Sequence, residues 1–266
     1  MTKFIITELQ DLPEGKIARV TIDNQRKLNT LNSTVIRELN ETLTTLDKDK
    51  DIAILVLTGA GSKSFIGGAD ITEMASLNPT SARSFITNIH HACHRVRYFH
   101  APVVARVNGF CLGAGMELAA ACDMIVACKR VDFAMPEVRV GIPSVIDAAL
   151  LPRIIGYNLA RDLVLTGRSM GAVEAREAGF VQRLTENDAL DAEVDNVISE
   201  ILAGGRNAMT IQKELCNDWE NNSLRDGIQL GIEAFAHSYE SDEPKRLMEN
   251  LSTVRASRHT SPFQPK

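Results

Sequence analysis

Short apolar strands alternate with helices through the first half of the chain. Residues 16–23 alternate apolar and polar side chains, and residues 52–59 form an apolar run that ends in glycine, so both predict strands. Between them, apolar residues recur at three- and four-residue steps after Asn32 or Ser33, either of which can cap a helix. Strand, helix and strand in this order predict a sheet with crossover helices.

The same order returns at residues 102–109, in an alanine-rich helix that starts near Ala114, and at residues 123–128. Such units recur at spacings of about 45 residues, which fits a stack of turns, although patterning alone does not establish a spiral. From residue 157 onward helical patterns dominate. The long amphipathic stretches cover roughly residues 188–203, 206–219 and 223–255.

Length, charge and cysteine content limit the classes of protein that this chain can represent. With 266 residues and 44% apolar side chains, it can bury the core of one large or two small domains. A net charge of −5 gives no cationic surface for nucleic acid or anionic lipid, so neither is expected as a partner.

The five cysteines show neither a disulfide framework nor the spacing of a metal site, which indicates a reducing compartment. The N-terminal segment has no long apolar run, and the last residues are not a peroxisomal signal, so we expect a cytoplasmic protein.

Two turns of small residues connect strands to helices. Gly67, Gly68 and Ala69 precede Asp70 and a helical pattern. Small residues let a ligand approach backbone N–H groups, and the start of a helix adds a partial positive charge. Taken alone, this segment is more simply interpreted as an ordinary flexible turn.

The second turn contains Gly113, Ala114 and Gly115 and leads into a helix that carries Glu117. Its glycines follow a GxxxGxG spacing rather than the GxGxxG of dinucleotide-binding folds, which argues against a nicotinamide cofactor.

Two glutamates accompany these turns. Glu117 lies among apolar residues that would raise the pKa of its carboxyl, although a glutamate in a first helical turn is also common on surfaces. Glu137 follows an apolar segment and a proline, where a solvated loop residue is the simpler interpretation. Together, two N–H-presenting turns and two carboxylates suit chemistry that develops negative charge on a carbonyl oxygen while protons move nearby.

The chain resembles the crotonase (enoyl-CoA hydratase/isomerase) family over roughly residues 15–200. The resemblance is carried by four motifs in the family's order: FIGGADITEM, NGFCLGAGMELAAACD, FAMPE and LPRIIGYNLARDLVLTGRSMGAVEAREAGFV. It implies an α/β fold of the ClpP/crotonase-like type, a spiral of repeated ββα turns with a C-terminal helical trimerisation region. Residues 1–200 would form the core with the acyl-CoA site, and residues 201–266 would mediate assembly into trimers or hexamers and cover the coenzyme A site.

The resemblance also implies roles for individual residues. The N–H groups of Ala69 and Ala114 would form an oxyanion hole for the thioester oxygen. The remaining residues expected along coenzyme A are Lys27, Leu28, Gly67, Asp70 and Ile71. No metal or redox cofactor is expected, because coenzyme A is part of the substrate.

Acidic residues at both Glu117 and Glu137 resemble family members that add water to 2-enoyl-CoA thioesters to give 3-hydroxyacyl-CoA. An enoyl-CoA isomerase or an acyl-CoA decarboxylase of the same family is the nearest alternative, and a non-catalytic relative that binds RNA is a more distant one.

One segment departs from the hydratase pattern. The chain reads GIPSVIDAALLPRIIG after Glu137, with Ser144, Val145 and Ile146 in place of glycines near the expected acyl group. Asp147 would either cap the next helix, the simpler expectation, or supply a third carboxylate.

The histidines nearby are not expected to bind a metal. The spacing of His90 and His94 permits a pair on one helical face, but the sequence offers no third ligand, so surface or interface positions are expected.

Overall fold

The computed structural model describes residues 3–250 of the chain. It divides into two compact units, Met1–Glu200 and Ile201–Lys266. The first unit contains both sheets, and the second is helical.

The main sheet of the first unit is six-stranded, in the order β1-β2-β3-β5-β7-β10. Its strands are β1 (Ile5–Leu12), β2 (Gly15–Ile22), β3 (Ile52–Gly59), β5 (Val103–Val107), β7 (Met124–Cys128) and β10 (Arg183–Thr185). All neighbouring pairs are parallel except the hairpin of β1 and β2. The predicted strands β2, β3, β5 and β7 are confirmed, whereas the pattern analysis did not identify β1, whose side chains are mostly exposed.

A smaller sheet has four strands in the order β4-β6-β8-β9. They are β4 (Ser64–Ile66), β6 (Phe110–Leu112), β8 (Asp132–Ala134) and β9 (Ser169–Gly171). Each of β3, β5 and β7 in the main sheet is followed by β4, β6 or β8 in the smaller one, and helical segments follow each of these pairs. This repeated strand, strand and helix order confirms the predicted crotonase-like architecture.

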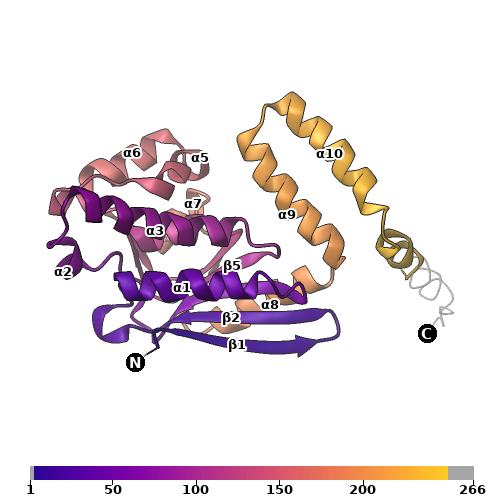
Figure 1. The fold of residues 1–266 in the computed structure, drawn as a ribbon, viewed down its shortest axis with the longest axis horizontal. Helices are drawn as coiled ribbons and strands as arrows, with labels where there is room; N and C mark the ends of the chain where they lie inside the picture. Colours follow the sequence, from indigo (N-terminus) through magenta and orange to yellow (C-terminus); the bar gives the residue numbers. More distant parts are fainter. Residues whose placement is uncertain (1–2, 251–266) are drawn as a thin grey trace, which may run out of the picture. The chain divides into compact units, whose positions relative to one another are not determined.

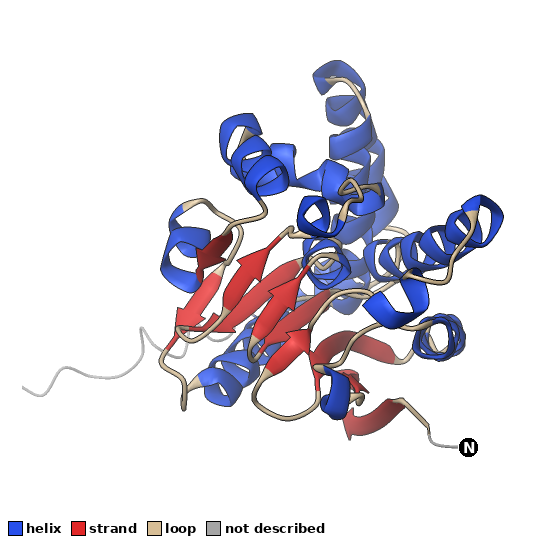
Figure 2. Cartoon of the chain, turned by 90° about the vertical axis from the view of Figure 1, so that its left-hand side faces the viewer, coloured by secondary structure: helices blue, strands red, loops and turns tan. Residues whose placement is uncertain are grey.

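Helices surround the strands of the first unit (Figure 2). They are α1 (Ser33–Leu46), α2 (Ile71–Met74), α3 (Pro79–Arg97), α4 (Ala114–Ala120), α5 (Leu151–Ile155), α6 (Tyr157–Thr166), α7 (Ala172–Glu177) and α8 (Leu190–Leu202), which extends to the second unit. Three short 3-10 helices are η1 (Gln25–Lys27), η2 (Glu137–Val140) and η3 (Ile146–Leu150).

Helix α1 shows how local sequence and packing agree. The Asn32 side chain caps it by accepting a hydrogen bond from the N–H of Val35 at 2.9 Å. Its buried stripe is Val35, Ile36, Leu39, Leu43 and Leu46. Figure 1 shows α1 and α3 lying side by side, and the two helices pack against each other.

The second unit contains α9 (Arg206–Asn221) and α10 (Leu224–Ser238), which pack against each other. The amphipathic stretch predicted over roughly residues 223–255 is not one continuous helix, because α10 ends at Ser238 and helical structure resumes only over residues 243–250. Pro244 accounts for the break, since proline is accepted in a first helical turn but not in a helix interior. Residues 251–255 of that prediction lie outside the described residues.

Within residues 3–250, no helix combines the length and the apolar character needed to cross a membrane.

Candidate active site

The two small-residue turns lie side by side at the ends of β4 and β6, which are parallel neighbours. After β4, residues Leu31 and Ala69 form a parallel bridge. The bridge uses the N–H groups of Leu31 and Asp70, each 2.9 Å from its acceptor. The N–H of Ala69 is therefore left without a hydrogen-bond acceptor in the described part of the chain.

The second turn exposes a backbone N–H in a different way. Gly113, at φ 51° and ψ −120°, donates its N–H to the carbonyl of Ala134 at 2.8 Å. Helix α4 begins at Ala114, and the first N–H groups of a helix have no acceptor within it. The N–H groups of Ala69 and Ala114 are thus both available to a ligand oxygen.

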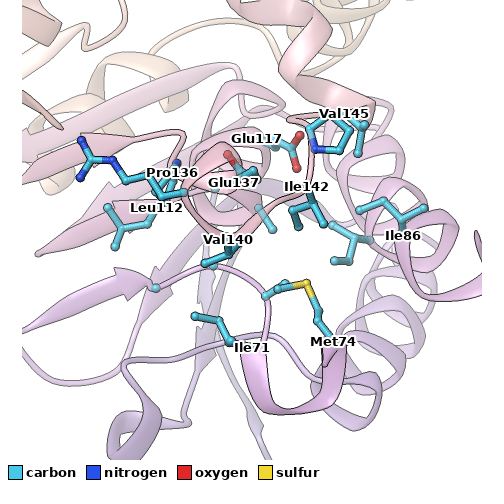
Figure 3. Close-up of a pocket in the computed structure, with 18 residues that line it drawn as sticks. Ile71, Met74, Ile86, Leu112, Glu117, Pro136, Glu137, Val140, Ile142 and Val145 are labelled. Carbon is cyan, nitrogen blue, oxygen red and sulfur yellow. The ribbon is translucent and has the colours of Figure 1, made fainter. Parts of the chain in front are cut away.

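A cavity of about 230 Å³ connects these turns to both glutamates. Figure 3 shows the carboxylates of Glu117 and Glu137 toward one end, with Ile71 and Met74 of α2 at the other. The lining is mostly apolar, as expected for a site that binds an acyl group. Of the residues predicted from the sequence, Gly67, Ala69, Ile71, Ala114, Glu117 and Glu137 line it.

Glu117 lies on α4 and is 3% exposed. Its Oε1 accepts a hydrogen bond from the N–H of Ala148 at 3.1 Å. Burial, with the nearby negative charge of Glu137 as a further cause, raises the pKa of Glu117 to about 8. Glu117 therefore keeps its proton at neutral pH. The alternative that Glu117 is an exposed residue of a first helical turn is wrong.

Glu137 is the first residue of η2 and is half-buried. Its Oε2 accepts a hydrogen bond from the Ser144 hydroxyl at 2.8 Å. Its Oε1 lies so close to Gly113 that a Cβ atom at this position would overlap it. The positive φ favours glycine at position 113, and a larger residue there would also displace the Glu137 carboxylate.

The segment that departs from the hydratase pattern contacts both glutamates. Val145 lines the cavity, Ser144 bonds to Glu137, and Ile146 adopts φ 43°, which is unusual for a β-branched residue. The expected helix-capping role of Asp147 is wrong, because Val145 occupies the N-cap of η3 and no side chain caps it. Asp147 is instead a buried carboxylate whose Oδ2 lies 2.8 Å from Nδ1 of His90.

The residues expected along the nucleotide form a separate cluster. Lys27 Nζ pairs with Asp70 Oδ2 at 2.7 Å, and this bond holds the pKa of Asp70 below its usual value. Asp70 also caps α2 by accepting the N–H of Thr72 at 2.9 Å. Leu28, at φ 53°, accepts the N–H of Gly67 at 2.9 Å. Lys27, Leu28 and Asp70 do not line the cavity itself.

Several residues that line the cavity were not predicted from the sequence. They are Met74, Ile86, Ile89, Leu112, Pro136, Arg139, Val140, Ile142 and Pro143. Ile86 and Ile89 lie three residues apart on α3, and this spacing was the available signal for a shared face. Within residues 3–250, no group of three or more His, Cys, Asp and Glu side chains is arranged to hold a metal ion.

Comparison with known proteins places this site in a family. The chain matches the enoyl-CoA hydratase/isomerase family over residues 13–255. The short-chain-enoyl-CoA hydratase of Clostridium acetobutylicum is 32% identical over 236 residues, which cover 88% of this chain and 90% of that protein. The crotonyl-CoA hydratase of Syntrophomonas wolfei is 31% identical over 236 residues, covering 88% and 91%.

The fold agrees with these sequence matches. The crystal structure of enoyl-CoA hydratase from Bacillus anthracis matches with a TM-score of 0.87 and 27% identity, covering 96% of both chains. Since the family match spans most of the sequence and relatives above 30% identity align over nearly their full length, the chain belongs to the enoyl-CoA hydratase/isomerase family, the crotonases.

Proposed function

We propose that this protein is an enoyl-CoA hydratase, which adds water across the double bond of a 2-enoyl-CoA thioester to give a 3-hydroxyacyl-CoA. The observation that carries the proposal is the meeting of Glu117, Glu137 and two backbone turns around one apolar cavity. Both relatives described above are named as hydratases of enoyl-CoA or crotonyl-CoA, which supports the same reaction.

In this mechanism the thioester oxygen accepts hydrogen bonds from the N–H groups of Ala69 and Ala114. These donors stabilise the negative charge that develops on the oxygen when hydroxide adds to the β-carbon. Each such donor contributes on the order of 3–4 kcal/mol of transition-state stabilisation.

The two glutamates hold the attacking water and share one proton, because burial and the charge of Glu137 keep Glu117 protonated. The glutamate without the proton takes one from the water as the water oxygen bonds to the β-carbon. The protonated glutamate gives its proton to the α-carbon, so the net change is the syn addition of one water. A proton transfer between the carboxyl groups then restores the starting state, and no metal or redox cofactor takes part.

The apolar cavity would receive the acyl chain, and the coenzyme A moiety would lie along Gly67, Ile71 and the cluster of Lys27, Leu28 and Asp70. Ile71 is 63% exposed, which leaves it free to contact a ligand. The Lys27 ammonium, whose side chain is 53% exposed, offers a positive charge to a phosphate of coenzyme A.

Assembly into a homotrimer or a dimer of trimers is part of the proposal. Helix α10 carries exposed apolar side chains along its length, which would favour association with other subunits. They are Leu224, Ile228, Ile232 and Phe235. In the assembled enzyme, the C-terminal unit would also cover the coenzyme A site.

Light scattering coupled to size exclusion would measure the assembly. We also propose a cytoplasmic location, which is supported by the five cysteines: none of them forms a disulfide within residues 3–250.

The reaction is tested by incubating the purified protein with a panel of straight and branched 2-enoyl-CoA thioesters, followed by mass spectrometry of the products. We expect a gain of one water that is lost in Glu137→Gln. Products of unchanged mass with a shifted double bond would indicate an isomerase, and loss of carbon dioxide from malonyl-type thioesters would indicate a decarboxylase. Either result without hydration would contradict the proposal.

A further inference from the structure

A buried aspartate and a histidine form a pair, and neither is among the residues that line the cavity. Asp147 is 8% exposed, and its Oδ2 lies 2.8 Å from Nδ1 of His90 on α3. The His90 side chain is 45% exposed, so this pair joins a buried carboxylate to the surface of the protein. A buried carboxylate is costly unless it is paired, which makes the contact with His90 important for the position of Asp147.

The loop that contains Asp147 binds both glutamates. Its Ser144 hydroxyl donates to Glu137 at 2.8 Å, and its Ala148 N–H donates to Glu117 at 3.1 Å. Between them lies Ile146 at φ 43°, a conformation that a β-branched residue adopts only when its surroundings hold it. The bond between Asp147 and His90 anchors this loop to α3, immediately beside Ala148.

The negative charge of Asp147 also acts on its neighbours. It is one of the charges that raise the pKa of Glu117, after burial and Glu137. On α3, one turn from His90, Cys93 is fully buried, and its thiol pKa is raised first by burial and then by the charges of Asp147 and Glu117. Helices α3, α4 and η3 therefore meet where Glu117, Asp147 and Cys93 lie close together.

We propose that Asp147 and His90 are positioning residues for the two glutamates: the bond between them anchors to α3 the loop whose Ser144 and Ala148 bind Glu137 and Glu117. This inference rests on the proposed hydratase function for its kinetic consequences. The electrostatic part, the effect of the Asp147 charge on the Glu117 carboxyl, accompanies this positioning and does not require a substrate.

Other titratable groups lie near Glu117 and also influence its titration. Glu137 faces it from η2, Asp147 from η3 and Cys93 from α3. Next to Asp147, α3 also carries His94, whose pKa is lowered by burial and by the neighbouring His90 and Arg95. Asp147→Asn leaves Glu137, Cys93 and His94 in place.

The electrostatic part is tested by following the carboxyl carbon of Glu117 in ¹³C-labelled protein by NMR as a function of pH. We expect Asp147→Asn to lower the midpoint of the Glu117 titration, because a nearby negative charge is removed while the shape of the side chain is kept. The control is Asp47→Asn, which alters a second Asp–His pair, with Asp47 Oδ1 2.8 Å from Nδ1 of His100, outside the cavity. A midpoint that stays the same in Asp147→Asn, or that moves equally in the control, would overturn this part.

The positioning part is tested by kinetics with a thioester hydrated by the unaltered protein. We expect His90→Ala to lower kcat about tenfold with little change in KM, and His90→Gln, which can still donate a hydrogen bond, to recover most of the loss. His90 is partly exposed, so these variants should fold even if Asp147→Asn does not. An unchanged kcat in His90→Ala would overturn the positioning role.

Failure of the hydratase proposal would be recognised separately, since the unaltered protein would then hydrate no thioester. A shifted Glu117 midpoint in that protein would still support the electrostatic role of Asp147.

Discussion

Glu117 and Glu137 line the same cavity, yet their carboxyl groups lie in different surroundings. Glu117 sits in the first turn of α4 among buried residues, and a single backbone N–H binds it. Glu137 is half-buried at the start of η2, accepts a hydroxyl hydrogen bond and rests against Gly113. Glu117 is thus removed from water more completely than Glu137, and this burial raises the pKa of the Glu117 carboxyl.

The largest effect is expected when either glutamate is replaced. Glu117→Gln and Glu137→Gln should each lower kcat/KM for hydration by about 10²–10⁴, the usual contribution of a positioned acid or base. Because the two groups act on one water, the double variant should lose little more than either single variant. Steady-state kinetics would show this, and circular dichroism would verify folding. Multiplied losses in the double variant would mean that the glutamates act independently.

The different burial of the two glutamates predicts a difference in stability against pH. The pKa of Glu117 is raised from 4.5 to about 8, so between these values the folded protein keeps a proton that the unfolded chain has released. The free energy of unfolding should therefore fall as pH rises through this window, by about 3–5 kcal/mol from this group alone. Denaturant unfolding at several pH values would measure this effect. In Glu117→Gln, the part of the fall in the free energy of unfolding that comes from Glu117 should be absent.

The exposed Glu177 provides a matched control for the pH experiment, because Glu177→Gln should follow the unaltered protein at every pH. If Glu117→Gln also follows the unaltered protein from pH 4.5 to 8, Glu117 does not retain its proton as the structure indicates.

Gly113 contacts the carboxylate of Glu137, and replacing this glycine tests how much the contact matters for activity. Gly113→Ala should displace the Glu137 carboxylate, because the new Cβ would overlap Oε1 and the backbone has φ 51°. A displacement of this kind lowers kcat on the order of 10²-fold. Gly171→Ala is the control, since nothing lies within 4 Å of the added Cβ and its φ is −69°. Equal kinetics for both variants would show that the approach of Glu137 to Gly113 is unimportant.

The smallest effect is expected at the hydroxyl that binds Glu137. Ser144→Ala removes one hydrogen bond, worth about 1 kcal/mol, and should lower kcat by roughly three- to tenfold. Ser144→Thr keeps a hydroxyl and should retain more activity than Ser144→Ala. A kinetic comparison of the two variants measures the contribution of this bond, and identical losses would assign the effect to packing instead.

Much of the fold could be predicted because its signals are local. The apolar runs of β2 and β3 and the stripe on α1 appear directly in the sequence, since each element buries one face or both. Strand β1 was missed because its outer position leaves most of its side chains exposed. The break after α10 was missed although its signal is also local: residues 240–246 are polar apart from Pro244, so the apolar period stops there.

The sequence by itself determined the family, the two turns and the two glutamates, because these depend on short motifs in a particular order. Only the tertiary structure decided what surrounds each carboxyl group. Asp147 lies beside Glu117 because η3 packs against α3 and α4, which brings together residues 57 positions apart at the bond to His90. Burial and charge at such a site come from the packing of distant segments, and for that reason local patterns do not reveal them.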